Sequence, residues 1–250
     1  MLKFLSKKLY GTIPTVKYVS QTQKKRSKNL IYFTTEYDLI NNKFFEILKK
    51  DRKHFLEDIK STKSTLFYVP EENSSYPCTE RMLVAQSPLN DLNKLRSLVG
   101  SSMSVFKQLK IKEFDIQFSP GFPLYQRKLI INNSIIAGYE NLEKGKATLT
   151  DFSPKERVLE KEKGEKEKEK QESPTVINIV EDEIISNHKN DINLWINLAK
   201  GNLYTRNLAN TRGSIGTPDF MHSEAESLVQ KYPDKIKMTV LKGIIKVIIL

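Results

Sequence analysis

The chain has almost no cysteine. Cys78 is the one cysteine in 250 residues, so an intrachain disulfide is excluded and a reducing compartment suits the protein. A catalytic thiol needs a neighbouring base, and the sequence around Cys78 nominates none. We therefore expect Cys78 to be an ordinary thiol rather than a nucleophile.

Long apolar runs are missing as well. A helix that crosses a membrane needs about 20 mainly apolar residues, whereas the apolar run at 244–250 has seven residues and contains a lysine. The pair Phe4 and Leu5 is too short for the core of a secretory signal. We expect no membrane span, and we interpret 244–250 as a strand or as a hydrophobic tail left by truncation.

Acidic residues are absent from the first 35 positions, which carry eight basic residues. Because the formal net charge of the whole chain is +11, most of the excess positive charge lies in this segment. A Lys-rich, acid-free segment with Leu, Phe, Ser and Thr is typical of a mitochondrial presequence, although Arg26 is its one arginine. We expect residues 1–29 to be a presequence or a disordered basic tail, in a mitochondrial or cytoplasmic protein.

The same charge distribution bears on nucleic acids. A nucleic-acid-binding domain usually carries its basic residues across a folded surface, whereas little net charge remains here beyond residue 35. We therefore do not expect nucleic acid as a partner. A basic RNA-binding protein that acts through its N-terminal segment is kept as the least favoured alternative.

Familiar catalytic and nucleotide-binding motifs are absent. The sequence contains no Walker loop, no G-x-G-x-x-G and no Ser-His-Asp order. On a helix, the spacing of His54 and Glu57 brings the two side chains together, whereas that of His222 and Glu224 separates them. Neither pair makes a zinc site, which needs three or four ligands. The acidic run at 181–183 is expected at a helix start, where it suits the helix dipole.

Strands alternate with helices between residues 30 and 150. Short runs rich in Val, Ile, Phe and Tyr predict strands, and apolar residues recurring every three or four positions predict helices. This alternation is typical of a mainly parallel sheet covered by helices, so the predicted fold class is α/β. We expect strands at 30–33, 66–69, 81–85, 113–118 and 147–150, and helices at 37–60, 89–110 and 122–139.

A low-complexity run separates this region from the rest. Residues 155–172 hold seven basic and seven acidic residues, which alternate so that like charges meet at i,i+4 on a helix. We interpret the run as a solvated linker or insertion. Beyond it, we expect strands at 176–180 and 236–241 and helices at 182–208 and 217–231.

The turn between the last two helices is the most informative motif. Gly213 and Gly216 indicate a tight turn, and Thr217, Pro218 and Asp219 are typical of a helix start as N-cap, first helical residue and first-turn acid. The segment 206–221 resembles the "ARDLxNxxxxxxTPxxM/L" segment that opens the catalytic domain of the leucyl aminopeptidase family of dinuclear metallopeptidases. Arg206 and Asn210 would then serve packing and hydrogen bonding rather than catalysis.

The resemblance implies a domain organisation. The family's N-terminal domain is an α/β sandwich similar to macro domains, and residues 134–139 match its end in order. The resemblance implies a macro-like α/β domain at 30–152, a charged linker at 153–175, a bridging helix region at 176–208, and a stub of a truncated catalytic domain at 209–250. Macro-like folds can bind ADP-ribose through Gly-rich loops, but Gly100 and Gly121 are isolated, so we do not expect this ligand.

The resemblance also implies an activity and indicates what is missing from it. The family releases N-terminal amino acids from peptides with two zinc or manganese ions, whose ligands come from motifs resembling "GKGxxFDSGG" and "NTDAEGRL". Neither motif occurs in the sequence. We therefore assign no catalytic, cofactor-binding or metal-binding residue, expect no bound cofactor, and expect this chain to be inactive alone. Family members are typically hexamers, so a homo-oligomer is an expected partner, and peptides are partners only of a completed catalytic domain. A non-enzymatic scaffold derived from the family is the alternative.

Overall fold

The structure is a computed structural model of the 250-residue chain. It describes residues 11–20, 27–42, 45, 46, 48, 50, 54–69, 77–88, 91–141, 174–211 and 216–240. The chain divides into two compact units, residues 1–205 and residues 206–250. Each unit is described by itself.

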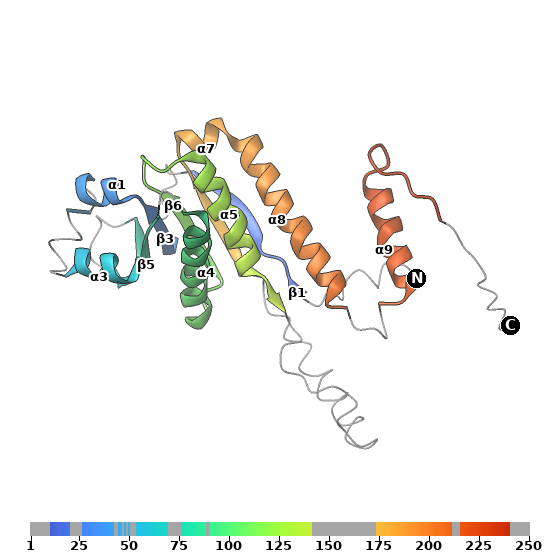
Figure 1. Ribbon diagram of the computed structural model, residues 1–250, viewed down its shortest axis with the longest axis horizontal. Helices are drawn as coiled ribbons and strands as arrows, with labels where there is room; N and C mark the ends of the chain where they lie inside the picture. Colours follow the sequence, from blue (N-terminus) through green and yellow to red (C-terminus); the bar gives the residue numbers. More distant parts are fainter. Residues whose placement is uncertain are drawn as a thin grey trace, which may run out of the picture. The chain divides into compact units, whose positions relative to one another are not determined.

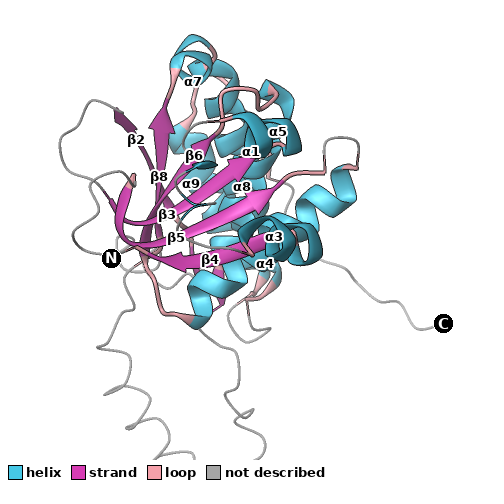
Figure 2. Ribbon diagram, turned by 90° about the vertical axis from the view of Figure 1, so that its left-hand side faces the viewer, coloured by secondary structure: helices cyan, strands magenta, loops and turns pink. Residues whose placement is uncertain are grey.

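The first unit is built on a six-stranded sheet (Figure 2). Four neighbouring pairs of strands run parallel, and only the edge strand β4 runs antiparallel to its neighbour β5. This confirms the expected α/β class with a mainly parallel sheet. The order across the sheet is β2 (Thr15–Ser20), β8 (Val176–Glu181), β6 (Glu113–Phe118), β3 (Ser27–Thr34), β5 (Cys78–Gln86) and β4 (Ser64–Tyr68). A separate antiparallel pair joins β1 (Gly11–Thr12) to β7 (Glu140–Asn141).

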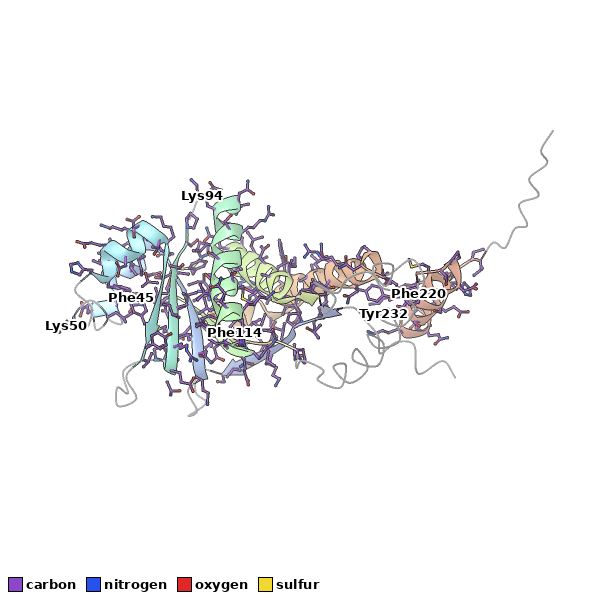
Figure 3. The ribbon with its side chains drawn as sticks, turned by 90° about the horizontal axis from the view of Figure 1, so that it is seen from below. Phe45, Lys50, Lys94, Phe114, Phe220 and Tyr232 are labelled. Atoms are coloured by element: carbon purple, nitrogen blue, oxygen red, sulfur yellow. The ribbon has the colours of Figure 1, made fainter. Side chains whose placement is uncertain are left out.

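Helices cover both faces of the sheet because its central strands are apolar on both sides. In β3, Ile31 and Phe33 point into one core and Leu30 and Tyr32 into the other. The first core is covered by α4 (Leu92–Gln108), α5 (Leu124–Gly138), α7 (Glu183–Asn187) and α8 (Lys189–Ala209). The second core is covered by α1 (Glu36–Asn41) and α3 (Phe55–Thr62). Figure 1 shows α4 and α5 on the opposite side of the strands from α1 and α3, and Figure 3 marks Phe114 and Phe45 in the two cores.

Local sequence explains where the helices begin and end. The Asp91 carboxylate accepts hydrogen bonds from the backbone N–H groups of Asn93 and Lys94 and so caps α4. At the other ends of helices, Lys63 after α3 and Lys110 after α4 have positive φ angles of 62° and 56°. Such left-handed residues end helices, although glycine is the usual choice there.

Most predicted elements of the first unit have counterparts. The strand predicted at 113–118 has these bounds, and the helices predicted at 89–110 and 122–139 occur as α4 and α5. Two long predicted helices are each divided: 37–60 contains α1, the helical residues 45, 46, 48 and 50, and α3, and 182–208 contains α7 and α8. The breaks lie at Asn42, which is extended, and at His188, which ends α7. The strand predicted at 147–150 and the charged run lie outside the described residues.

The N-terminal segment differs from the expectation of a presequence or disordered tail. Residues 15–20 form β2, which pairs with β8 along its whole length, and β3 begins at Ser27. Val16 and Tyr18 pack against the first core, while Thr15 and Lys17 are exposed, as expected of a half-buried strand. The interpretation of this segment as a disordered tail was therefore wrong for residues 11–20 and 27–29, because its lysine content concealed this alternation. The presequence stays a prediction.

The second unit contains α9 (Pro218–Lys231). Its start confirms the prediction: the Thr217 hydroxyl accepts from the Phe220 N–H at 3.2 Å, Pro218 is the first helical residue, and Asp219 lies in the first turn. The strand predicted at 236–241 is wrong over 236–240, which are not in a strand. A strand needs a partner to satisfy its backbone groups, and the described part of this unit provides none. Residues 212–215 and 241 lie outside the described residues.

Candidate functional site

The carboxyl edge of the parallel strands is the place to examine for a site. In open α/β sheets, ligands bind where neighbouring strands lead to helices on opposite faces. Here β3 leads to α1 on one face, while its neighbour β6 leads to α5 on the other. The segments that follow β3, β5, β6 and β8 bring a set of buried polar side chains to this edge.

Asp38 is at the centre of this set. It lies in α1 and is only 8% exposed. Its carboxylate accepts hydrogen bonds from the Ser119 hydroxyl at 2.5 Å and from the Thr35 hydroxyl at 3.0 Å. Thr35 is also the N-cap of α1 and accepts from the Asp38 N–H. A Cβ atom on Gly121 would lie 2.9 Å from an Asp38 carboxylate oxygen, so the segment after β6 fits against Asp38 only because residue 121 is glycine.

Arg127 holds the same segment from the other side. Its side chain is fully buried, and its guanidinium donates to the carbonyl oxygens of Phe122 at 2.8 Å and Ser119 at 3.1 Å. It also pairs with the Asp182 carboxylate and lies 5.2 Å from the centre of the Phe118 ring. Asp182 in turn caps α7 by accepting from the Ile185 N–H at 2.9 Å. One buried arginine therefore joins the end of β6, the start of α5 and the start of α7.

The end of β5 adds a second buried polar group. Ser87 donates to the Gln126 side chain at 3.0 Å, and Gln126 donates to the Tyr125 hydroxyl at 2.9 Å. Gln86 is 7% exposed and pairs in register with Thr34 of β3. Within the described part of the chain, its side-chain oxygen has no hydrogen-bond donor.

Burial and the charges of this edge act on the Tyr32 phenol of β3. Burial, and then the negative charge of Asp38, raise the pKa of the Tyr32 phenol to about 12, so that the phenol stays protonated near neutral pH. The carboxylates of Asp38 and Asp182 are both occupied by hydrogen bonds or an ion pair within the chain. These side chains hold the segments that follow β3 and β6.

The histidines and the cysteine singled out in the sequence lie apart from this edge. His54 and Glu57 are exposed and 3.0 Å apart, which confirms that their spacing brings them together. His222 is 4.0 Å from Glu226, one turn further along α9, a pair that the sequence analysis missed. Cys78 is fully buried and its thiol donates to the Arg81 carbonyl oxygen at 3.3 Å.

Among the residues that the structure describes, no three His, Cys, Asp or Glu side chains are grouped so that they could hold a metal ion. These residues therefore do not fit a dinuclear zinc or manganese centre. Arg206 and Asn210, which we expected to pack, are exposed. Near the end of α8 it is Asn207 that is buried. Gly100 lies inside α4 rather than in a loop.

The sequence analysis missed three residues of this cluster, Asp38, Ser119 and Arg127. It placed the fourth, Asp182, only at a helix start. One signal was present: Ser119, Pro120 and Gly121 directly follow a strand, and such segments lie at the carboxyl edge of a parallel sheet. Arg127 gave no signal, because arginine on a helix is usually exposed.

Comparisons with known proteins agree with the fold. No family model matches the sequence, and no curated protein matches it significantly. Among solved structures, a mutant of tomato leucine aminopeptidase is similar to this chain with a TM-score of 0.57 and 14% sequence identity. The match covers 88% of this chain and 43% of the tomato chain, so this chain spans less than half of that protein's length. At this identity the likeness shows a shared fold. No described helix is both long and apolar enough to cross a membrane.

Proposed function

We propose that this chain is the N-terminal α/β part of a leucyl-aminopeptidase-like protein, followed by the first elements of the catalytic domain. In this proposal residues 30–152 form the macro-like domain, 153–175 the linker, 176–208 the bridging helix region and 209–250 the start of the catalytic domain. The structural likeness to the tomato enzyme supports the proposal. The helix start at Thr217, which belongs to the motif that first suggested the family, supports it independently.

We further propose that the 250 residues do not hydrolyse peptides by themselves. Peptide hydrolysis of this kind needs two metal ions that polarise the carbonyl and activate water. The two motifs that would supply their ligands are absent from the sequence. Peptides, zinc and manganese are thus substrates and cofactors only for a protein that contains those motifs.

A non-enzymatic scaffold is the second candidate. The observation that favours it is the set of contacts at the carboxyl edge of the sheet. There Asp38 accepts from Ser119, and Arg127 donates to the Phe122 carbonyl oxygen and pairs with Asp182. Side chains used in this way stabilise a rigid surface and are not free to act on a substrate.

An aminopeptidase assay tests the proposal directly. The purified chain is incubated with Leu-p-nitroanilide and Mn²⁺ or Zn²⁺, with tomato leucine aminopeptidase as the positive control. We expect no release of p-nitroaniline above the metal-free blank. Turnover that requires the metal and is abolished by a chelator would overturn the proposed inactivity.

A further inference from the structure

The outer face of α8 carries two exposed leucines. α8 packs on the first core beside α5 (Figure 1), and the Asn132 side chain of α5 donates to the Trp195 carbonyl oxygen of α8 at 2.9 Å. The inner face of α8 is buried and consists of Ile192, Ile196, Ala199 and Leu203. On the other side of the helix, Leu194 and Leu198 are 57% and 56% exposed. Because they are four residues apart, they lie next to each other along the helix.

Small residues continue this face toward the end of the helix. Gly201 follows Leu198 after three residues, and a Cβ atom on it would have no atom within 4 Å. Glycine inside a helix is less stable than alanine by about 0.5–1 kcal/mol, and nothing packed against Gly201 in the single chain requires it. One turn further on, the Thr205 hydroxyl donates back to the Gly201 carbonyl oxygen at 3.1 Å. The outer face therefore has projecting leucines in its first half and small residues in its second half, so it is complementary to itself in the antiparallel direction.

Two charges on the same flank of α8 specify the partner and its direction. Asp191 precedes the leucines and Arg206 follows the small residues, and both side chains are exposed. In a two-fold symmetric antiparallel pair of helices, each flank faces its own copy, so Asp191 lies beside the partner's Arg206 at both ends of the contact. Parallel packing would bring like charges together instead. In the single chain, the Asp191 carboxylate is 59% exposed and 3.5 Å from the Lys128 amino group, a contact that leaves it accessible.

We propose that α8 packs antiparallel against α8 of a second copy of this chain, about a two-fold axis near Leu198. Leu194 of each copy packs over the small residues Gly201 and Thr205 of the other, and the two Leu198 side chains meet at the axis. The contact from residue 191 to residue 206 is roughly 22 Å long at 1.5 Å per residue. One pair of helices buries little area compared with a standard interface, so the dimer is a weak one. This pairing does not depend on the proposed relation to aminopeptidases.

The first test places a charge at the axis without touching the core. Leu198→Glu keeps a good helix former at an exposed position and brings two like charges together in the dimer. The matched control is Lys200→Glu, because Lys200 is exposed on a different side of α8. Sedimentation equilibrium of the full wild-type chain should give a mass that rises with concentration from 28.9 kDa toward twice that value. Leu198→Glu should weaken the Kd by about tenfold or more, whereas Lys200→Glu should leave it unchanged.

A charge exchange tests the direction of the pair. Asp191→Arg and Arg206→Asp should each weaken the dimer, and the double variant should restore it, because opposite charges then meet again at both ends. Circular dichroism checks that every variant keeps its helix content. A wild-type chain that is monomeric at all accessible concentrations would overturn the proposal. So would a dimer that is unaffected by Leu198→Glu, or single charge reversals that the double variant does not rescue.

Discussion

At the scale of single residues, the backbone at Gly121 packs directly against the Asp38 carboxylate. Because a Cβ on Gly121 would lie 2.9 Å from an Asp38 oxygen, Gly121→Ala must displace a buried hydrogen-bonded carboxylate. We expect it to lower the free energy of unfolding by about 1–3 kcal/mol. Urea denaturation provides the measurement.

Gly201 is the matched control for that change. It lies within α8, and a Cβ there would have no atom within 4 Å. Gly201→Ala should therefore raise the free energy of unfolding by about 0.5–1 kcal/mol, because alanine favours a helix. Equal effects of the two substitutions would contradict the close contact at Gly121.

Tyr32 should make the free energy of unfolding decrease at alkaline pH. Its folded pKa of about 12 exceeds the ordinary 10.0, chiefly because burial disfavours the phenolate. The stability due to the protonated phenol is complete below pH 10 and is lost as the pH rises toward 12. The free energy of unfolding of the wild type, relative to that of Tyr32→Phe, should fall by about 2–3 kcal/mol over this interval. A difference that stays constant with pH would show that Tyr32 titrates normally.

At the scale of elements, Arg127 joins α5, α7 and the end of β6. Arg127→Met leaves the Asp182 carboxylate and the Phe122 carbonyl oxygen without their buried donor. We expect Arg127→Met to lower the free energy of unfolding by about 3–5 kcal/mol. Asp182→Asn removes the ion pair with Arg127 but keeps a side-chain oxygen that can cap α7. The double variant should lose clearly less than the sum of the single losses. Additive losses, measured by urea denaturation, would mean that the two residues act independently.

The elements also show what the sequence could predict. The strand at 113–118 was predictable to the residue, because Phe114, Ile116 and Phe118 alternate with polar residues and meet one core. The start of α9 was predictable because capping is a local interaction. The break at Asn42 was not, since the apolar spacing continues through it. The polar cluster at the sheet edge was not predictable either, because the Arg127–Asp182 pair joins positions 55 residues apart.

At the scale of the whole molecule, β2 bears on the N-terminal segment. A chain that begins at residue 21 lacks β2, and with it Val16 and Tyr18 on the first core. Compared with a chain that begins at residue 11, we expect it to lose at least about 2 kcal/mol in the free energy of unfolding. Thermal and urea denaturation of the two shortened chains measure this loss, and equal stabilities would show that β2 is dispensable.

The same strand limits any targeting role. If residues at the N-terminus direct import into mitochondria, their removal must spare both β1 and β2, so the mature protein should begin at or before residue 11. N-terminal sequencing of the protein isolated from mitochondria would reveal the cleavage site. A mature N-terminus beyond residue 20 would be incompatible with the sheet described here.

The pairing of β2 with β8 also has a consequence for synthesis on the ribosome. Paired residues such as Lys17 and Asn178 are about 160 positions apart in the chain. After β2 leaves the ribosome, nearly the whole first unit must therefore be translated before its partner β8 exists. During that interval the nascent chain carries an unpaired strand with one apolar face, which is the kind of segment that chaperones bind.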